Sequence, residues 1–220
     1  MTDYVQSRRK MVDNQLRTND VTDNRILDAM EWVPREKFVT ASKQSVAYID
    51  EELPVNSSAT RFLIKPHIFG KLIQLAEVRE ADVVLVVGAG SGYSAAVLSR
   101  LAASVVAVEE DADLAASASE MLIELGIENA AVVEGILKDG CASEGPYDVI
   151  VVDGAVAAEV PEKLLTQLKG AGRLVAIEGQ GGAASARVYQ NSDGVIAPRF
   201  GFNASTALLP GFEKVPQFVF

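Results

Sequence analysis

A series of short apolar runs in the second half of the chain constrains its fold more than any other feature. Each run is apolar at successive positions instead of alternate ones, and amphipathic stretches separate the runs. This pattern indicates parallel strands that are covered on both faces and joined by crossover helices. The sequence therefore predicts a doubly wound, mostly parallel α/β sheet. The five runs are residues 83–87, 104–108, 130–134, 148–152 and 173–177.

The amino-terminal part of the chain has a different, helical pattern. Apolar residues recur at helical spacing after Thr22, which can cap a helix, and Pro34 ends that pattern. Residues 46–65 have no periodicity and predict a loop, after which Pro66 can begin another helix. We expect residues 1–76 to form a helical segment with a substrate-side loop, packed on the rest of the chain as one structural unit.

The carboxyl-terminal part continues the sheet. A glycine-rich turn follows Gly179, and three further apolar runs come after it, at residues 186–190, 195–200 and 206–209. These runs predict antiparallel strands at one edge of the sheet. Residues 77–220 are therefore expected to form a Rossmann-like core with carboxyl-terminal strands.

The charge of the chain argues against several kinds of partner. The 20 Lys and Arg residues are outnumbered by 30 Asp and Glu residues, which gives a net charge of -10. Such a chain repels nucleic acid and anionic membranes on average, so we expect neither as a partner. Residues 1–15 are polar where a secretory signal has an apolar core, and no window approaches the ~18 apolar residues of a membrane span. The expected location is the cytoplasm.

Cysteine and histidine are too scarce for several kinds of chemistry. Cys141 is the only cysteine, which excludes an intrachain disulfide and a thiolate zinc cluster, and its loop-like surroundings favour a spectator role. His67 is the only histidine, so we predict no metal site. It follows Pro66 at a predicted helix start, where it either faces a cleft or caps the turn, and we favour the structural role.

A glycine-rich loop follows the first apolar run and precedes a helix predicted over residues 94–101. Glycines let the backbone approach a ligand closely, although a purely structural turn would have the same composition. A dinucleotide-binding fingerprint has a sixth-position glycine, and here that position is Tyr93. The loop therefore suits a ligand without a pyrophosphate, such as S-adenosylmethionine. The predicted cofactor-binding residues of the loop are Gly88, Ala89, Gly90, Ser91 and Gly92.

The second run ends in an acidic residue at an informative distance from this loop. Glu109 comes 21 residues after Gly88, close to the ~20 expected for a ribose-binding carboxylate at the end of a strand. We therefore predict Glu109 as a further cofactor contact. Glu110 and Asp111 follow it, and we expect them to cap the next helix.

Several blocks of the sequence resemble one enzyme family. Residues 11–17 read Met-Val-Asp-Asn-Gln-Leu-Arg, and residues 33–39 read Val-Pro-Arg-Glu-Lys-Phe-Val. With the glycine loop and residues 161–174, they closely resemble the protein-L-isoaspartate O-methyltransferases, and generic methyltransferases lack the amino-terminal block. The resemblance implies a class I methyltransferase fold and S-adenosylmethionine as cofactor. It also implies methylation of isoaspartyl carboxylates in damaged proteins.

Three positions depart from the family's pattern. Ile64 stands where the family has an active-site serine, and Ile136 where it has an acid that binds the adenine amino group. Asp153 replaces part of a segment of small residues, and either acts in the site or caps a helix. Thr60 or Ser58 is a possible source of the missing hydroxyl. Thr60 and Asp153 are therefore the catalytic candidates.

The expected chemistry needs no general base. A carboxylate with a pKa of about 4 is already ionised at pH 7, so catalysis depends on placement and exclusion of water. We predict a methyltransferase that acts on a protein or peptide carboxylate, with isoaspartyl methylation weakened by the altered 56–65 loop. Two alternatives remain: a degenerate relative that serves as a binding or regulatory module, and a methyltransferase for a different small acceptor, marked by Asp153.

Overall fold

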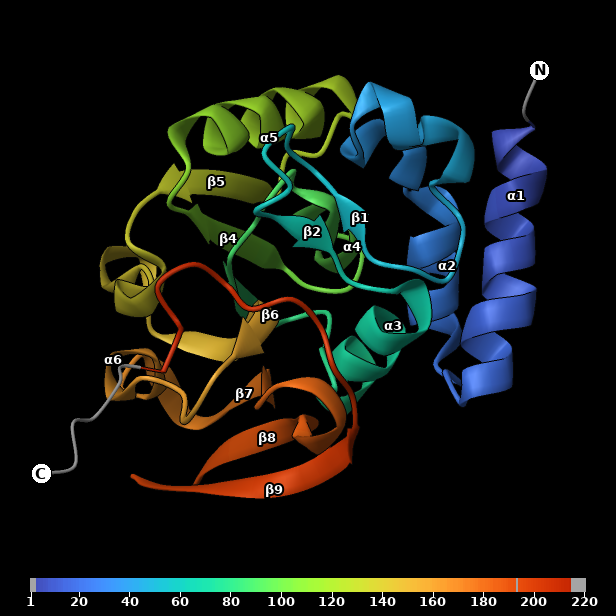
Figure 1. Ribbon diagram of the computed structural model, residues 1–220. Coiled ribbons are helices and arrows are strands. Elements are labelled where there is room, and N and C mark those ends of the chain that lie inside the picture. Colours follow the sequence, from blue (N-terminus) through green and yellow to red (C-terminus); the bar gives the residue numbers. More distant parts are fainter. Residues whose placement is uncertain (1–2, 193, 215–220) are drawn as a thin grey trace, which may run out of the picture.

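The computed structural model of the protein describes residues 3–192 and 194–214. A seven-stranded sheet in the order β5-β4-β3-β6-β7-β8-β9 forms its centre (Figure 1). The strands from β5 to β7 are parallel, and β8 and β9 add an antiparallel edge, which confirms the predicted fold class. The strands of this sheet are β3 (Val83–Val87), β4 (Ser104–Glu109), β5 (Ala130–Glu134), β6 (Tyr147–Val156), β7 (Leu168–Glu178), β8 (Ser185–Ser192) and β9 (Val195–Asn203).

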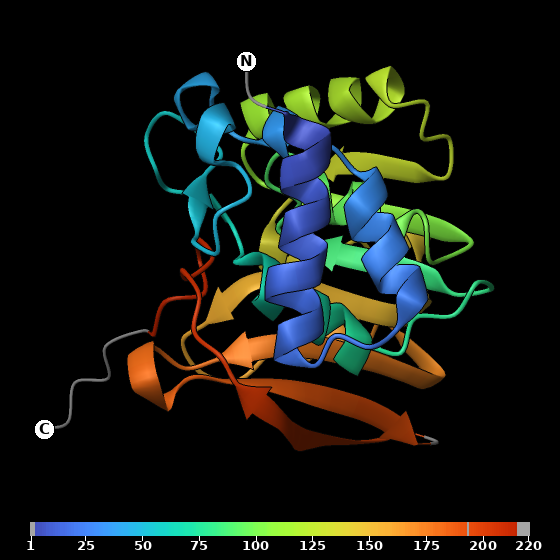
Figure 2. The same cartoon turned by 90° about the vertical axis from the view of Figure 1, so that its right-hand side faces the viewer.

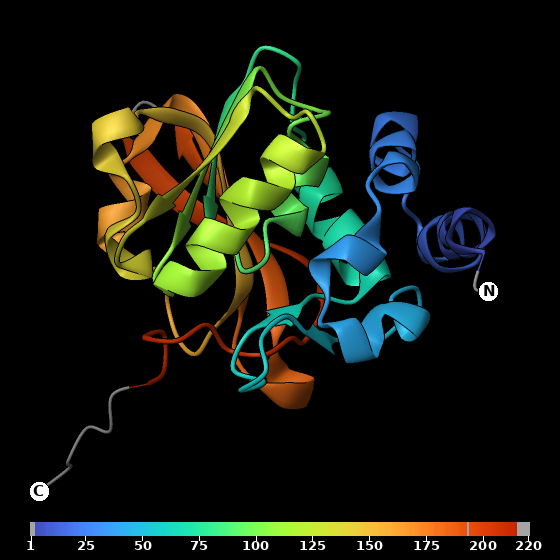
Figure 3. The same cartoon turned by 90° about the horizontal axis from the view of Figure 1, so that it is seen from above.

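The helices lie in two unequal layers on the faces of the sheet. Seen from above, α1 to α3 lie on one side of the sheet, and α6 lies on the other (Figure 3). The second face is covered mainly by this short helix and by single 3₁₀ turns. No helix among the described residues has the length and apolar character needed to cross a membrane. The helices are α1 (Tyr4–Met11), α2 (Asn24–Trp32), α3 (Pro66–Leu75), α4 (Tyr93–Leu98), α5 (Ala112–Glu124) and α6 (Glu162–Leu165).

The central strands are buried on both faces, as their unbroken apolar runs predict. Along β3, Val84 and Val86 belong to the hydrophobic cluster on the face of α1 to α4, while Leu85 and Val87 belong to the cluster on the opposite face. The prediction is wrong for β5, where Val133 is 36% exposed. That strand lies at an edge of the sheet, so its outer positions have no neighbouring strand.

The structure corrects three predictions about the boundaries of elements. Asp23, not Thr22, caps α2, because its side chain accepts a hydrogen bond from the Arg25 amide. Residues 46–65 are not all loop, since β1 (Leu53–Pro54) pairs with β2 (Phe62–Leu63). The predicted helix over 94–101 is shorter, and begins at Tyr93 after a glycine with left-handed backbone.

The run at residues 206–209 is not an edge strand, which is a fourth correction. Leu208 makes an isolated parallel bridge to Ala155 of β6, and the Leu209 amide donates to the Ala155 carbonyl. The Ala207 amide donates to the Glu52 side chain. The segment therefore crosses the end of β6 instead of extending the antiparallel edge, because its backbone bonds go to β6 and the 46–65 region.

The chain changes direction across the sheet at β3. Its neighbours β4 and β6 are both parallel to it and lie on opposite sides, so the carboxyl end of β3 is a topological switch point, where ligands of such sheets bind. Figure 2 shows the segment around β1 and β2 and the segment after β9 at this same end of the sheet. The glycine loop follows β3, Glu109 is the last residue of β4, and Asp153 lies near the carboxyl end of β6.

Candidate functional site

The glycine loop needs its glycines for backbone geometry and for packing. Gly88, Gly90 and Gly92 have φ values of 89°, 54° and 91°, in the left-handed region that favours glycine. A Cβ atom on Gly92 would lie 3.1 Å from the Cβ of Ala118, which belongs to α5. The loop is therefore a tight, buried turn at the carboxyl end of β3.

The Glu109 carboxylate lies directly against this loop. Its Oε2 atom accepts a hydrogen bond of 2.6 Å from the Gly90 amide, and its Oε1 atom accepts from the amides of Glu110 and Asp111 at 3.0 and 3.2 Å. The side chain is 1% exposed and forms a 2.7 Å ion pair with the Nη2 atom of Arg61. The structure thus brings together the two parts of the predicted cofactor site, Glu109 and the loop.

Asp153 is within β6, and this position excludes a helix-capping role. The strand continues to Val156, and α6 begins only at Glu162. Val152 pairs with Val87, so Asp153 lies beside Gly88 at the switch point. Burial raises the pKa of the Asp153 carboxyl to about 6, although the nearby guanidinium groups of Arg61 and Arg35 lower it.

Thr60 lies at the mouth of a cavity beside Glu109. The Thr60 side chain is exposed, and its hydroxyl accepts a hydrogen bond of 2.8 Å from the Asn56 amide group. The cavity has a volume of about 260 Å³. Its lining residues are Thr60, Arg61, Glu109, Glu110, Asp111, Leu137 and Pro210.

The two isoleucines at departing positions have opposite environments. Ile64 is 3% exposed in the hydrophobic core, and its carbonyl accepts from Arg35, so no hydroxyl is presented from that position. Ile136 is 58% exposed next to Leu137, which lines the cavity. An acid that binds the adenine amino group is thus absent from the position where the family pattern has one.

Arg61 is a residue of the site that the sequence does not identify. Its side chain is 5% exposed and paired with Glu109. The two residues are 48 positions apart. No motif or spacing in the sequence signals that pair.

Several buried polar groups surround Asp153. Burial raises the pKa of the Asp153 carboxyl, and the Ser94 hydroxyl lies close enough to lower it in part. Burial likewise raises the pKa of Tyr93, and the Arg35 guanidinium opposes that rise. The interior next to the glycine loop is therefore polar as well as buried.

Three other predicted residues serve the fold. Asp111 caps α5 as predicted, because its carboxylate accepts from the amides of Asp113 and Leu114, whereas the prediction is wrong for Glu110, which precedes the capping position. His67 does not cap α3, since its Nδ1 atom lies 2.7 Å from an Asp50 carboxylate oxygen. Cys141 is free and buried, in keeping with its predicted spectator role.

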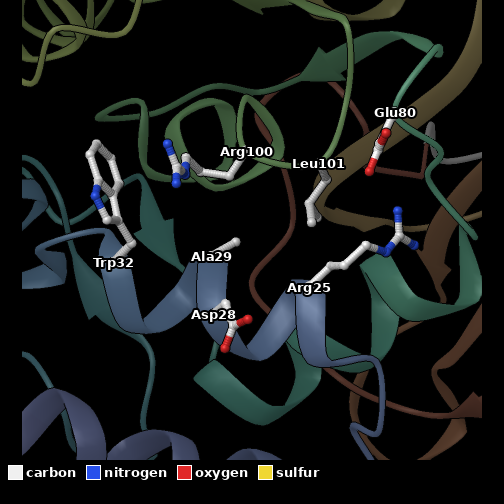
Figure 4. A pocket seen from close by; sticks show the side chains of 7 residues that line it. All are labelled: Arg25, Asp28, Ala29, Trp32, Glu80, Arg100 and Leu101. Atoms are coloured by element: carbon white, nitrogen blue, oxygen red, sulfur yellow. The ribbon is translucent and has the colours of Figure 1, made fainter.

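A larger cavity of about 350 Å³ lies at the opposite end of the sheet (Figure 4). It has both basic and acidic side chains, and Arg100 stacks 4.6 Å from the centre of the Trp32 ring. Residues 80 and 100–101 precede β3 and β4, so this cavity is remote from the glycine loop. Its lining residues are Arg25, Asp28, Ala29, Trp32, Glu80, Arg100 and Leu101.

Comparison with known proteins agrees with this geometry. The family model of protein-L-isoaspartate(D-aspartate) O-methyltransferase matches residues 6–199. A protein-L-isoaspartate O-methyltransferase of Koribacter versatilis is 41% identical over 175 residues, which cover 80% of this chain and 78% of the relative. One of Methanoculleus marisnigri is 42% identical over 169 residues, which cover 77% of this chain and 76% of the relative.

Solved structures show the same fold. A protein-L-isoaspartate O-methyltransferase superposes with a TM-score of 0.80 at 28% identity, over 92% of this chain and 66% of that one. A Plasmodium falciparum chain solved with S-adenosyl-L-homocysteine has a TM-score of 0.76 at 20% identity, over 92% of this chain and 97% of that one, and supports the fold alone. The family match spans the amino-terminal helices, the switch point and the antiparallel edge, and the chain belongs to the protein-L-isoaspartate(D-aspartate) O-methyltransferase family.

Proposed function

We propose that this chain transfers a methyl group from S-adenosylmethionine to the free carboxylate of isoaspartyl residues in proteins and peptides. The observation that carries the proposal is the Gly90 amide bonded to the buried Glu109 carboxylate at the switch point, in a chain of this family. The predicted ribose-binding acid and the glycine loop thus form one continuous surface at the edge where such sheets bind ligands.

The residues around the glycine loop suit the cofactor by shape and by polarity. S-adenosylmethionine supplies a methyl group activated by a positively charged sulfur. Residues 88–92 would hold its amino-acid end, Glu109 would accept from the ribose hydroxyls, and the cavity beside Leu137 would take the adenine. No step of the reaction requires a metal ion.

The residues around the acceptor carboxylate would act by positioning it, not by transferring a proton. An ionised carboxylate attacks the methyl carbon directly, so the protein must align it and exclude water. Thr60, at the cavity mouth, is the candidate donor to the acceptor carboxylate, and residues 1–76 would form the acceptor side. Asp153 would favour positive charge at the reaction centre. Because Ile64 is buried without a hydroxyl, we expect slow turnover compared with other family members.

The proposal places the reaction in the cytoplasm, which the single cysteine favours because one cysteine cannot form an intrachain disulfide of the kind common in secreted proteins. Its partner would be a damaged protein or peptide, and neither nucleic acid nor a membrane takes part. The net charge of -10 supports this choice of partner.

Incubation with methyl-labelled S-adenosylmethionine and an isoaspartyl peptide tests the proposal. Label transferred to the peptide as a base-labile ester would support it. Binding of S-adenosylhomocysteine without transfer to any peptide would favour a degenerate binding module. Transfer to a small molecule, lost in Asp153→Asn, would favour a different acceptor.

A further inference from the structure

We propose that the Arg61 side chain occupies part of the cofactor pocket. It stays paired with Glu109 until the ribose of the cofactor displaces it. This inference rests on the proposed role of Glu109 as the ribose-binding residue. It adds that the protein must break one of its own ion pairs to bind the cofactor.

The first support is the position of the guanidinium group. Arg61 Nη2 lies 2.7 Å from Glu109 Oε2, the same oxygen that accepts the Gly90 amide. It also lies 3.1 Å from the point where a Cβ atom of Gly88 would be. The guanidinium group therefore covers the glycine loop at the place where close approach of a ligand is expected.

The second support is the number of donors on the Glu109 carboxylate. An ionised carboxylate offers about four acceptor positions. The amides of Gly90, Glu110 and Asp111 take three of them, and Arg61 takes the fourth. The three amides are part of the backbone of the loop and of the start of α5. Arg61 is therefore the donor that can leave when a ribose hydroxyl arrives.

The third support is the attachment of Arg61 to the rest of the protein. Residues 56–60 form a turn closed on itself, because Asn56 Oδ1 accepts from the amides of Thr60 and Arg61. The side chains from Ser57 to Thr60 are exposed. The Arg61 carbonyl accepts a hydrogen bond of 2.9 Å from the Val55 amide, next to the pairing of Phe62 with β1. The strand pair therefore holds the backbone of Arg61, and only its side chain has to rotate out of the pocket toward the exposed turn.

Charge explains why the pocket holds an arginine when the cofactor is absent. Glu109 is 1% and Asp153 is 8% exposed; Arg61 forms an ion pair with Glu109, and its charge partly offsets the rise in the pKa of the Asp153 carboxyl that burial causes. Two buried carboxylates without a cation would be costly. S-adenosylmethionine carries a sulfonium and an ammonium group, and S-adenosylhomocysteine keeps the ammonium group, so the binding of either ligand brings a positive charge to the pocket that Arg61 leaves.

Calorimetric titration with S-adenosylhomocysteine tests this inference. Arg61→Ala should bind the ligand about tenfold more tightly than the wild type, because no ion pair has to be broken; tenfold corresponds to about 1.4 kcal/mol. Without ligand, the same variant should melt at a lower temperature than the wild type. Arg199→Ala, which removes an exposed arginine from β9, is the matched control and should change neither quantity.

Arg61→Gln provides a second variant if alanine prevents folding. It keeps much of the side-chain volume without the charge, and should also bind more tightly than the wild type. Wild-type binding together with unchanged or weaker binding by both variants would overturn the Arg61 inference and leave the proposed function standing. Failure of every variant to bind at millimolar ligand would instead overturn the proposed cofactor site, and the inference with it.

Discussion

Four donors converge on the Glu109 carboxylate, and this arrangement requires an ionised acid at that position. Glu109→Gln replaces one acceptor oxygen by an NH₂ group, which repels either the amide donors or the ribose hydroxyls. Each charge-assisted hydrogen bond contributes about 1.5–3 kcal/mol. We therefore expect the Kd of S-adenosylhomocysteine, measured by calorimetry, to rise by roughly tenfold or more.

An exposed acid on α5 provides the control for this substitution. Glu120 is exposed in the body of that helix, away from the residues that line the cavity. Glu120→Gln should leave the Kd unchanged. An affinity of Glu109→Gln within a factor of about two of the wild type would remove this residue from the cofactor site.

Asp153 should make the stability of the protein depend on pH. Burial raises the pKa of the Asp153 carboxyl from 3.8 to about 6, so the folded state prefers its protonated form. Its ionisation costs no stability below pH 3.8, and the full cost of about 3 kcal/mol is reached above pH 6. Asp153→Asn removes this cost.

Urea unfolding at pH 4 and pH 7 measures the effect of Asp153. The free energy of unfolding of Asp153→Asn minus that of the wild type should be larger at pH 7 than at pH 4, by up to about 3 kcal/mol. A difference between variant and wild type that is the same at both pH values would show that the Asp153 carboxylate is not buried as described.

Among the elements, α5 connects the stability of the fold with the candidate site. Its capping residue Asp111 also lines the cavity and donates its amide to Glu109. Asp111→Ala removes a side-chain cap, which typically lowers the free energy of unfolding by about 1 kcal/mol. Glu120→Ala, an exposed change in the body of the same helix, should change the free energy of unfolding by less than about 0.5 kcal/mol. Equal losses in urea unfolding would contradict the capping role of Asp111.

The segment 56–65 has two halves with different functions. Residues 57–60 are exposed and close to the cavity, whereas Leu63 and Ile64 belong to the core. Introduction of the family's serine as Ile64→Ser should therefore lower the free energy of unfolding by about 3 kcal/mol without raising turnover.

The matched control for Ile64→Ser is Ile123→Ser, on the surface of α5. Ile123 is 77% exposed, so its substitution should change the free energy of unfolding by less than about 0.5 kcal/mol. Faster methylation of an isoaspartyl peptide by Ile64→Ser would show that position 64 does reach the acceptor.

For the whole molecule, the sequence predicts those features that depend on local pattern. The unbroken apolar runs identify the sheet because burial on both faces requires them at each position, and the spacing of Gly88 and Glu109 reflects one strand–helix–strand unit. The contact between Arg61 and Glu109 depends on how a distant turn folds over the loop, and no local pattern encodes it. The same holds for Leu208, whose partner Ala155 is in another element.

A pair of peptides tests the proposed methylation of isoaspartyl residues most directly. The two peptides share one sequence and differ only in whether a single aspartyl linkage is normal or isoaspartyl. With methyl-labelled S-adenosylmethionine, the wild-type protein should form a base-labile methyl ester on the isoaspartyl peptide only, and Glu109→Gln should form less of it. Equal labelling of both peptides, or no labelling of either by a protein that binds S-adenosylhomocysteine, would contradict the account.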